Sequence, residues 1–175
     1  MPHDGAPMPT DLPQTPLLAD LLGLTAAAVK PAEALLDAAT TRLRDRVTAD
    51  GRVSAGKLEQ NQIAAHGLAW LSTYVEALRQ MQSWAERLSA EGKFGEPEKL
   101  LHQIAFGEYL SQIQGGIPMS QGEILRPQDI GLTQDDRRAF MTAEVATLAE
   151  AGNTQAARSQ LVEFMRETGV SDGVG

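Results

Sequence analysis

The sequence predicts an all-α protein, a helical bundle built around one long central helix over residues 54–91. This stretch contains no proline, and it contains no glycine between Gly67 and Gly92. Its apolar residues recur at steps of three and four, which places them on one side of a helix. The resulting face, centred on Leu71 and Leu78, is too wide for the narrow seam of a two-stranded coiled coil. The rest of the chain, in which no segment alternates like a strand, is therefore expected to supply helices that cover this face.

The N-terminal part predicts a disordered lead-in followed by the start of one helical domain. Residues 1–16 hold five prolines among polar and small residues, a composition that cannot bury a core. The single helical domain is expected over residues 17–169. It begins with a short helix over residues 17–22 that Gly23 ends. A further turn over residues 25–30 leads to a helix over residues 31–48, with Pro31 in its first turn.

The C-terminal half predicts three helices separated by a structured loop. Pro97 opens a helix that ends at the Gly115–Gly116 pair. Residues 117–132 show no clean period but carry enough apolar side chains to be an ordered excursion across the bundle. Thr133, with Asp136 three residues later, resembles a capping box and begins a helix that ends before residue 152. A last helix covers residues 154–168, and residues 170–175 are expected to be a linker stub.

Composition excludes several classes of function. The net charge of −8 and the sequence pI near 4.8 leave no basic stripe for a nucleic acid and disfavour an anionic membrane surface. No run of residues approaches the length of an apolar membrane span, and the first residues do not resemble a signal peptide. Because the chain has no cysteine, it has no disulfide or thiolate metal site, and we expect a cytoplasmic protein.

The candidate catalytic and metal-binding residues form no convincing set. His66 and His102 lie on consecutive predicted helices, and Glu98 precedes His102 by about one turn. A carboxylate-bridged metal site in a bundle uses Glu-x-x-His pairs, and the chain contains none. Nucleophile, phosphate-loop and dinucleotide motifs are also absent from the sequence. We therefore expect no metal site and no catalytic residue here, so an autonomous enzyme is the weakest hypothesis.

One motif resembles the C-terminal helical domain of the acyl-CoA dehydrogenase family. It runs Gln-Ile-Gln-Gly-Gly over residues 112–116 and is followed by a Glu-Ile-Leu-Arg-Pro-Gln-Asp-Ile element over residues 123–130. The resemblance implies that Gln112 and Gly116 match the positions that approach the FAD of a neighbouring subunit. A glycine lets the backbone come close to a cofactor, and a glutamine amide can hydrogen-bond to it. The family's downstream Tyr-Glu-Gly-Thr segment, which often supplies the catalytic base, is replaced by Gly-Leu-Thr-Gln at residues 131–134.

A longer resemblance covers residues 51–132, especially residues 64–71, 104–110 and 115–123. These residues are similar to an extra N-terminal helical region found in one branch of the family, flavoproteins of the ethylmalonyl-CoA pathway that oxidise a branched acyl-CoA. The resemblance implies a non-catalytic domain that binds no cofactor alone and packs on its own dehydrogenase core or on sister subunits of a homo-oligomer. FAD and the acyl-CoA substrate would then belong to the parent enzyme. The alternative, from another class, is a free-standing helical module for oligomerisation or protein interaction.

Overall fold

The all-α prediction is confirmed by a computed structural model, which describes residues 16–167. The predicted linker stub, and the predicted lead-in apart from Pro16, lie outside the described residues. Seven α-helices, two short two-stranded ribbons and one 3-10 helix make up the described part of the chain. The helices are α1 (Leu21–Val47), α2 (Ala55–Gln60), α3 (Gln62–Ala90), α4 (Glu96–Gly115), α5 (Gln134–Phe140), α6 (Ala143–Ala151) and α7 (Gln155–Glu167), with the 3-10 helix η1 (Pro127–Ile130) before α5.

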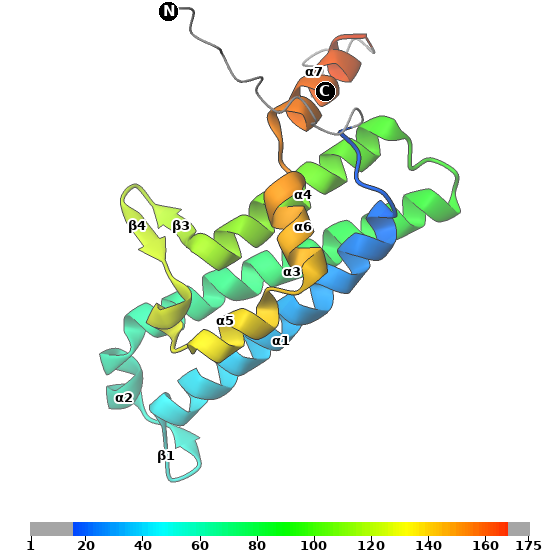
Figure 1. Cartoon of the computed structure of the whole chain (residues 1–175). Coiled ribbons are helices and arrows are strands. Elements are labelled where there is room, and N and C mark those ends of the chain that lie inside the picture. The colour runs from blue at the N-terminus through cyan, green and yellow to red at the C-terminus, as the bar shows by residue number, and fades with distance from the viewer. Residues whose placement is uncertain (1–15, 168–175) are drawn as a thin grey trace, which may run out of the picture.

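Three long helices form the body of the molecule, with α3 packed against both α1 and α4 (Figure 1). Helix α5 packs on α1, α6 lies across α1 and α4, and α7 packs on α4 at one end of the bundle. The core lies between these helices, where Leu71, Val75 and Leu78 of α3 meet Leu35 of α1 and Leu110 of α4. The predicted inward face of the central helix is therefore confirmed at its centre.

Helix α1 corrects the prediction of separate short helices at the start of the domain. It runs unbroken from Leu21 to Val47, with Gly23 in its first turn and Pro31 in its interior. Proline removes one helical hydrogen bond and normally ends or kinks a helix. Here the residues around it, including Ala28, Ala32 and Leu35, are almost fully buried against the core. Burial of these apolar residues offsets the cost of the hydrogen bond lost at Pro31, so tertiary packing keeps the helix continuous.

The central helix also differs from its prediction, because residues 54–91 form two helices that meet at Asn61. Its backbone leaves the helical region, with φ −117° and ψ 24°. The Asn61 amide donates instead to the carbonyl of Lys57 at 2.8 Å, a local bond through which asparagine competes with helix geometry. Beyond this break α3 begins on the surface. The apolar spacing of the sequence places Ile63 on the buried side of the helix, but its side chain is 75% exposed.

Two short antiparallel ribbons correct the prediction that the chain has no strands. Strands β1 (Thr48–Ala49) and β2 (Arg52–Val53) form a tight turn between α1 and α2. Strands β3 (Ile117–Ser120) and β4 (Glu123–Leu125) make a hairpin within the segment that was expected to be an ordered excursion. Neither ribbon is long enough to show a period of two in the sequence.

A second break divides the predicted helix over residues 133–151 into α5 and α6. The chain turns at Met141, and the Thr142 hydroxyl accepts a hydrogen bond from the Val145 N–H as a new N-cap. The capping box of Thr133 and Asp136 that begins α5 is confirmed. The apolar spacing of the sequence also places Leu101 of α4 in the core, but its side chain is 51% exposed.

Candidate functional site

The predicted cofactor motif lies where α4 ends and the β3–β4 hairpin begins. Gly116 ends the helix with φ 142°, a conformation that L side chains rarely adopt. The hairpin folds back over this residue, so an added Cβ at Gly116 would lie 2.4 Å from the Ile124 side chain. Gly67 of α3 is covered in the same way by the Leu125 side chain, also at 2.4 Å. The two glycines therefore serve close packing of the hairpin onto α3 and α4.

Gln112 uses both ends of its amide inside the chain. Its Oε1 accepts a hydrogen bond from the Tyr74 hydroxyl, and its Nε2 donates to Glu108 Oε1, each at 2.5 Å. The pKa of Tyr74 is raised mainly by burial and, to a smaller extent, by the neighbouring Tyr109 and Glu108. Its hydroxyl therefore stays protonated and able to donate. Both ends of the Gln112 amide are thus engaged within the chain. FAD binding by Gln112 and Gly116 stays a prediction from the resemblance.

The hydrogen bonds of Gln112 belong to a longer polar chain across three helices. Glu108 accepts a second bond through Oε2 from the Asn153 amide at 2.5 Å, and Asn153 accepts from Arg158 Nε at 2.6 Å. This series of hydrogen bonds thus joins α3, α4 and the start of α7. The spacing of Glu108 and Gln112, four residues apart on one helix, is a signal that sequence reasoning did not use.

His102 lies in a buried polar cluster in the core and is only 1% exposed. Its Nε2 lies 3.0 Å from the Thr25 hydroxyl oxygen, and the carbonyl oxygens of the Gln82 side chain and of Leu21 lie 2.7 Å and 2.9 Å from the same hydroxyl. Because the hydroxyl has one proton and both carbonyls only accept, Nε2 must be the protonated nitrogen that donates to Thr25. The other nitrogen, Nδ1, has no partner among the described residues, and burial lowers the pKa of His102 to about 4.

His66 lies on the surface, and the structure does not bring it to His102. Its Nε2 accepts a hydrogen bond from the Trp70 indole at 3.0 Å. His102 instead contacts the rings of Trp84 and Phe106. Trp84 is 18 residues beyond His66 on α3, a separation of roughly 27 Å along a helix. Within residues 16–167, no three histidine or carboxylate side chains gather as a metal site would require.

Another buried polar residue, Gln103, holds segments together. Its Oε1 accepts from the Leu18 N–H at 2.7 Å, while its Nε2 donates to the Pro16 carbonyl at 2.7 Å and the Gly152 carbonyl at 3.1 Å. This amide joins the residues before α1 to the end of α6. Sequence reasoning missed Gln103 and Thr25, because a polar residue inside an apolar helical pattern does not reveal its distant partners.

The fold and these polar clusters define an all-α domain in which the side chains of Thr25, Gln103 and Gln112 are hydrogen-bonded within the chain. No known protein-family profile matches the chain. The chain is 55% identical over 152 residues to (2S)-methylsuccinyl-CoA dehydrogenase from Cereibacter sphaeroides. The alignment covers 87% of this chain but only 27% of that protein, so the chain spans about a quarter of its relative. The predicted resemblance is confirmed, and the chain is related in sequence to part of an acyl-CoA dehydrogenase, an oxidoreductase. None of the helices described is long and apolar enough to cross a membrane.

Proposed function

We propose that the chain is a non-catalytic, N-terminal helical domain of an FAD-dependent acyl-CoA dehydrogenase, which packs on the dehydrogenase core and supports assembly of a homo-oligomer. The observation that carries this proposal is the asymmetry of the match, which takes in 87% of this chain and 27% of its relative. The parent enzyme would oxidise methylsuccinyl-CoA to mesaconyl-CoA in the ethylmalonyl-CoA pathway. FAD and the acyl-CoA would bind to the part of the parent that this chain does not match.

The chemistry of the reaction supports a non-catalytic role. Oxidation next to a thioester needs a carboxylate that removes a proton and a flavin that accepts hydride from the adjacent carbon. Gln112 and Gly116 supply neither group. One amide and one glycine backbone offer one or two hydrogen bonds, each contributing about 0.5–1.5 kcal/mol net. Micromolar affinity for FAD requires about 8 kcal/mol, so these contacts cannot retain the cofactor alone.

The hairpin end of the molecule offers a surface for docking on the core. Ile63 at the start of α3 is 75% exposed and Ile124 of β4 is 47% exposed. Both line one open pocket of about 520 Å³, together with His66, Met119 and Arg126. Ile63, Ile124 and Met119 line the same pocket and so form one apolar surface, and a contiguous exposed apolar surface is a candidate protein contact. The hairpin is held on α3 and α4 by its contacts with Gly67 and Gly116, so this surface is preorganised.

The docking proposal can be tested by mixing the chain with the Cereibacter sphaeroides enzyme from which the aligned segment has been deleted. We expect the two polypeptides to elute as one complex in size-exclusion chromatography. The double substitution Ile63→Asp and Ile124→Asp should abolish co-elution. Val162→Asp on α7, where the side chain is 51% exposed, is a matched control that should leave the complex intact.

Two outcomes would contradict the proposal. Separate elution of the unmodified chain and the truncated enzyme would remove the docking role. Self-association of the chain in the absence of the enzyme would favour the alternative, a free-standing oligomerisation module. A reading frame that continues from this chain into an FAD-binding dehydrogenase sequence would support the proposal independently, whereas a stop codon directly after Gly175 would favour the alternative.

A further inference from the structure

A second pocket, separate from the Ile63–Ile124 surface, opens where α1, the end of α4, η1 and α5 meet. Its volume is about 360 Å³, at the small end of the range for ligand pockets. The floor is apolar and belongs to the core: Leu35, Ile113 and Phe140 line it and are each exposed by 3% or less. The wall at Met141 exists because the chain leaves the helix there, between α5 and α6.

The mouth of this pocket is polar and carries positive charge. Gln114, Gln134, Arg137 and Arg138 line it. Arg138 pairs with Asp135 at 3.2 Å, but both side chains are well exposed, so this pair holds the arginine only weakly. The side chains of Arg137, Gln114 and Gln134 make no hydrogen bond or ion pair with any residue between 16 and 167.

The electrostatics of the pocket favour an anion. No aspartate or glutamate is among its lining residues in the described chain, although the protein as a whole has a net charge of −8. The acidic residue next to Arg137 in sequence, Asp136, is bonded to Arg42 and Thr133 instead. A guanidinium without a carboxylate partner, beside an apolar floor, is the arrangement that recognises a carboxylate or phosphate attached to an apolar body.

We propose that this pocket binds a small amphipathic anion, with its charged head on Arg137 and its short apolar chain on the floor formed by Leu35, Ile113 and Phe140. The amides of Gln114 and Gln134 donate to the remaining oxygens of the head group. The site uses none of the residues assigned to cofactor binding or to docking on the dehydrogenase core. It therefore does not depend on the proposed function.

Octanoate is a suitable probe, because it joins one carboxylate to an apolar chain of modest length. We expect the 175-residue chain to bind it saturably in a calorimetric titration, with a dissociation constant below about 1 mM. Arg137→Gln should weaken binding about tenfold, the effect of losing one charge-assisted hydrogen bond. Arg52→Gln, an exposed arginine on β2 that lines neither this pocket nor the docking surface, is the matched control and should not change the affinity.

Three further probes distinguish an anion site from a surface that binds any apolar chain. Octyl phosphate should bind at least as well as octanoate, whereas octanol and octyltrimethylammonium should bind at least about tenfold more weakly. In nitrogen-15 spectra, octanoate should shift the side-chain amides of Gln114 and Gln134. Absence of saturable octanoate binding, equal binding of octanol, or an unchanged affinity in the folded Arg137→Gln variant would each overturn the proposal.

Discussion

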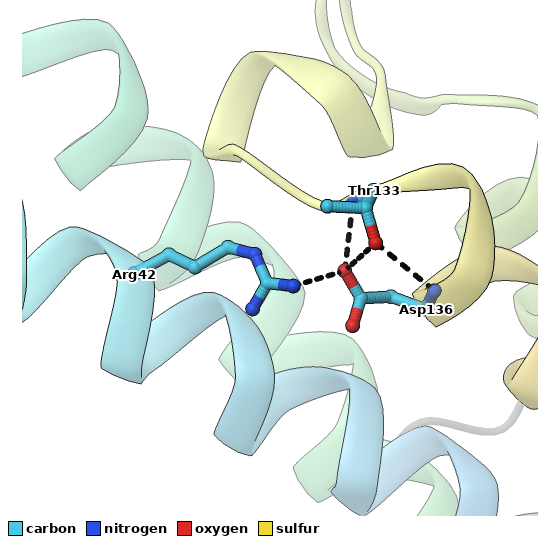
Figure 2. Close-up of polar contacts among 3 residues, drawn as sticks. All are labelled: Arg42, Thr133 and Asp136. Carbon is cyan, nitrogen blue, oxygen red and sulfur yellow. Dashed lines mark hydrogen bonds and ion pairs between the residues drawn. The ribbon is translucent and has the colours of Figure 1, made fainter.

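The carboxylate of Asp136 lies 2.6 Å from the guanidinium of Arg42 and joins the start of α5 to α1 (Figure 2). The same oxygen of Asp136 accepts bonds from the Thr133 N–H at 2.6 Å and the Thr133 hydroxyl at 2.5 Å. These bonds hold the pKa of Asp136 below its usual range, with the Thr133 hydroxyl as the largest cause and Arg42 as a smaller one. One carboxylate therefore both caps a helix and fixes that helix to the bundle.

Replacing Asp136 should destabilise the protein in a pH-dependent way. Asp136→Asn is expected to lower the free energy of unfolding by about 1–2 kcal/mol at pH 7, because the cap and the ion pair are both weakened. A lowered pKa in the folded state means that the stabilisation is present above the ordinary aspartate pKa of about 3.9 and is lost as pH falls through the folded pKa. Urea unfolding at several pH values should therefore show the difference between the two proteins shrinking below about pH 4.

Asp135→Asn is the matched control for this measurement. Asp135 lies in the same helical turn, but its ion pair with Arg138 is exposed, so its loss should change stability by less than about 0.5 kcal/mol. Equal losses for the two variants, or a difference that does not depend on pH, would contradict the role given to Asp136.

A pair of glycine substitutions tests how the hairpin is held on α3. Gly67→Ala would place a methyl group 2.4 Å from the Leu125 side chain and 2.9 Å from that of Ile130. We expect a loss of about 1–3 kcal/mol, although alanine normally favours a helix over glycine. Gly56→Ala in α2 meets nothing within 4 Å and should be neutral or stabilising by about 0.5 kcal/mol. Thermal unfolding of both variants checks the prediction, and a stabilised Gly67→Ala would refute the close contact.

The elements that the sequence predicts correctly are those whose signals are local. The cap at Thr133 and the helix stop at Gly116 depend on residues within one or two turns, and the structure contains both. The apolar spacing through Leu71 and Leu78 likewise reports a buried helix face directly.

The wrong predictions concern positions where distant packing decides between local alternatives. Pro31 is tolerated because α1 is buried along α3. The residues near Pro31 in the sequence do not predict that contact. The break at Met141 had a signal in the Thr142 cap, which the longer apolar pattern obscured. For the candidate site, Gln112 could be placed on α4 from sequence, but its bond to Tyr74, 38 residues away, could not.

The buried imidazole of His102 should make the free energy of unfolding depend on pH in the acidic range between 6.5 and 4. Its pKa falls from 6.5 to about 4 on folding because the charged form is buried away from water. The folded state therefore binds fewer protons than the unfolded state between these values, so stability should fall as pH drops from 6.5 towards 4. The total loss should reach about 3 kcal/mol, at about 1.4 kcal/mol for each unit of pKa difference.

A His102→Gln variant isolates this contribution, since glutamine can still donate to Thr25 but does not titrate in this range. The free energy of unfolding of this variant should lack the His102 contribution to the fall between pH 6.5 and 4. This holds even if the variant is less stable than the unmodified protein at pH 7. Measuring both proteins by urea unfolding across this interval gives the comparison. Parallel curves would show that His102 is not the group responsible.

The neighbouring glutamines on α4 distinguish a structural amide from a cofactor ligand. Gln112→Ala removes hydrogen bonds to the Tyr74 hydroxyl and to Glu108, and it should cost about 1–2 kcal/mol of unfolding free energy. Gln114→Ala, two residues away, removes an exposed side chain that has no hydrogen bond to residues 16–167, and it should change stability by less than about 0.5 kcal/mol. Urea unfolding of the two variants under one condition makes the comparison.

A cofactor assay on the same proteins completes the test. FAD is added to the unmodified chain and to each variant, the samples are desalted, and the visible spectrum is recorded. We expect no retained flavin in any of them, because the Gln112 amide is already bonded inside the chain and Ile124 covers Gly116. If the unmodified chain instead kept about one flavin per molecule and Gln112→Ala lost it without losing stability, the amide would be a ligand, and the non-catalytic assignment would have to be abandoned.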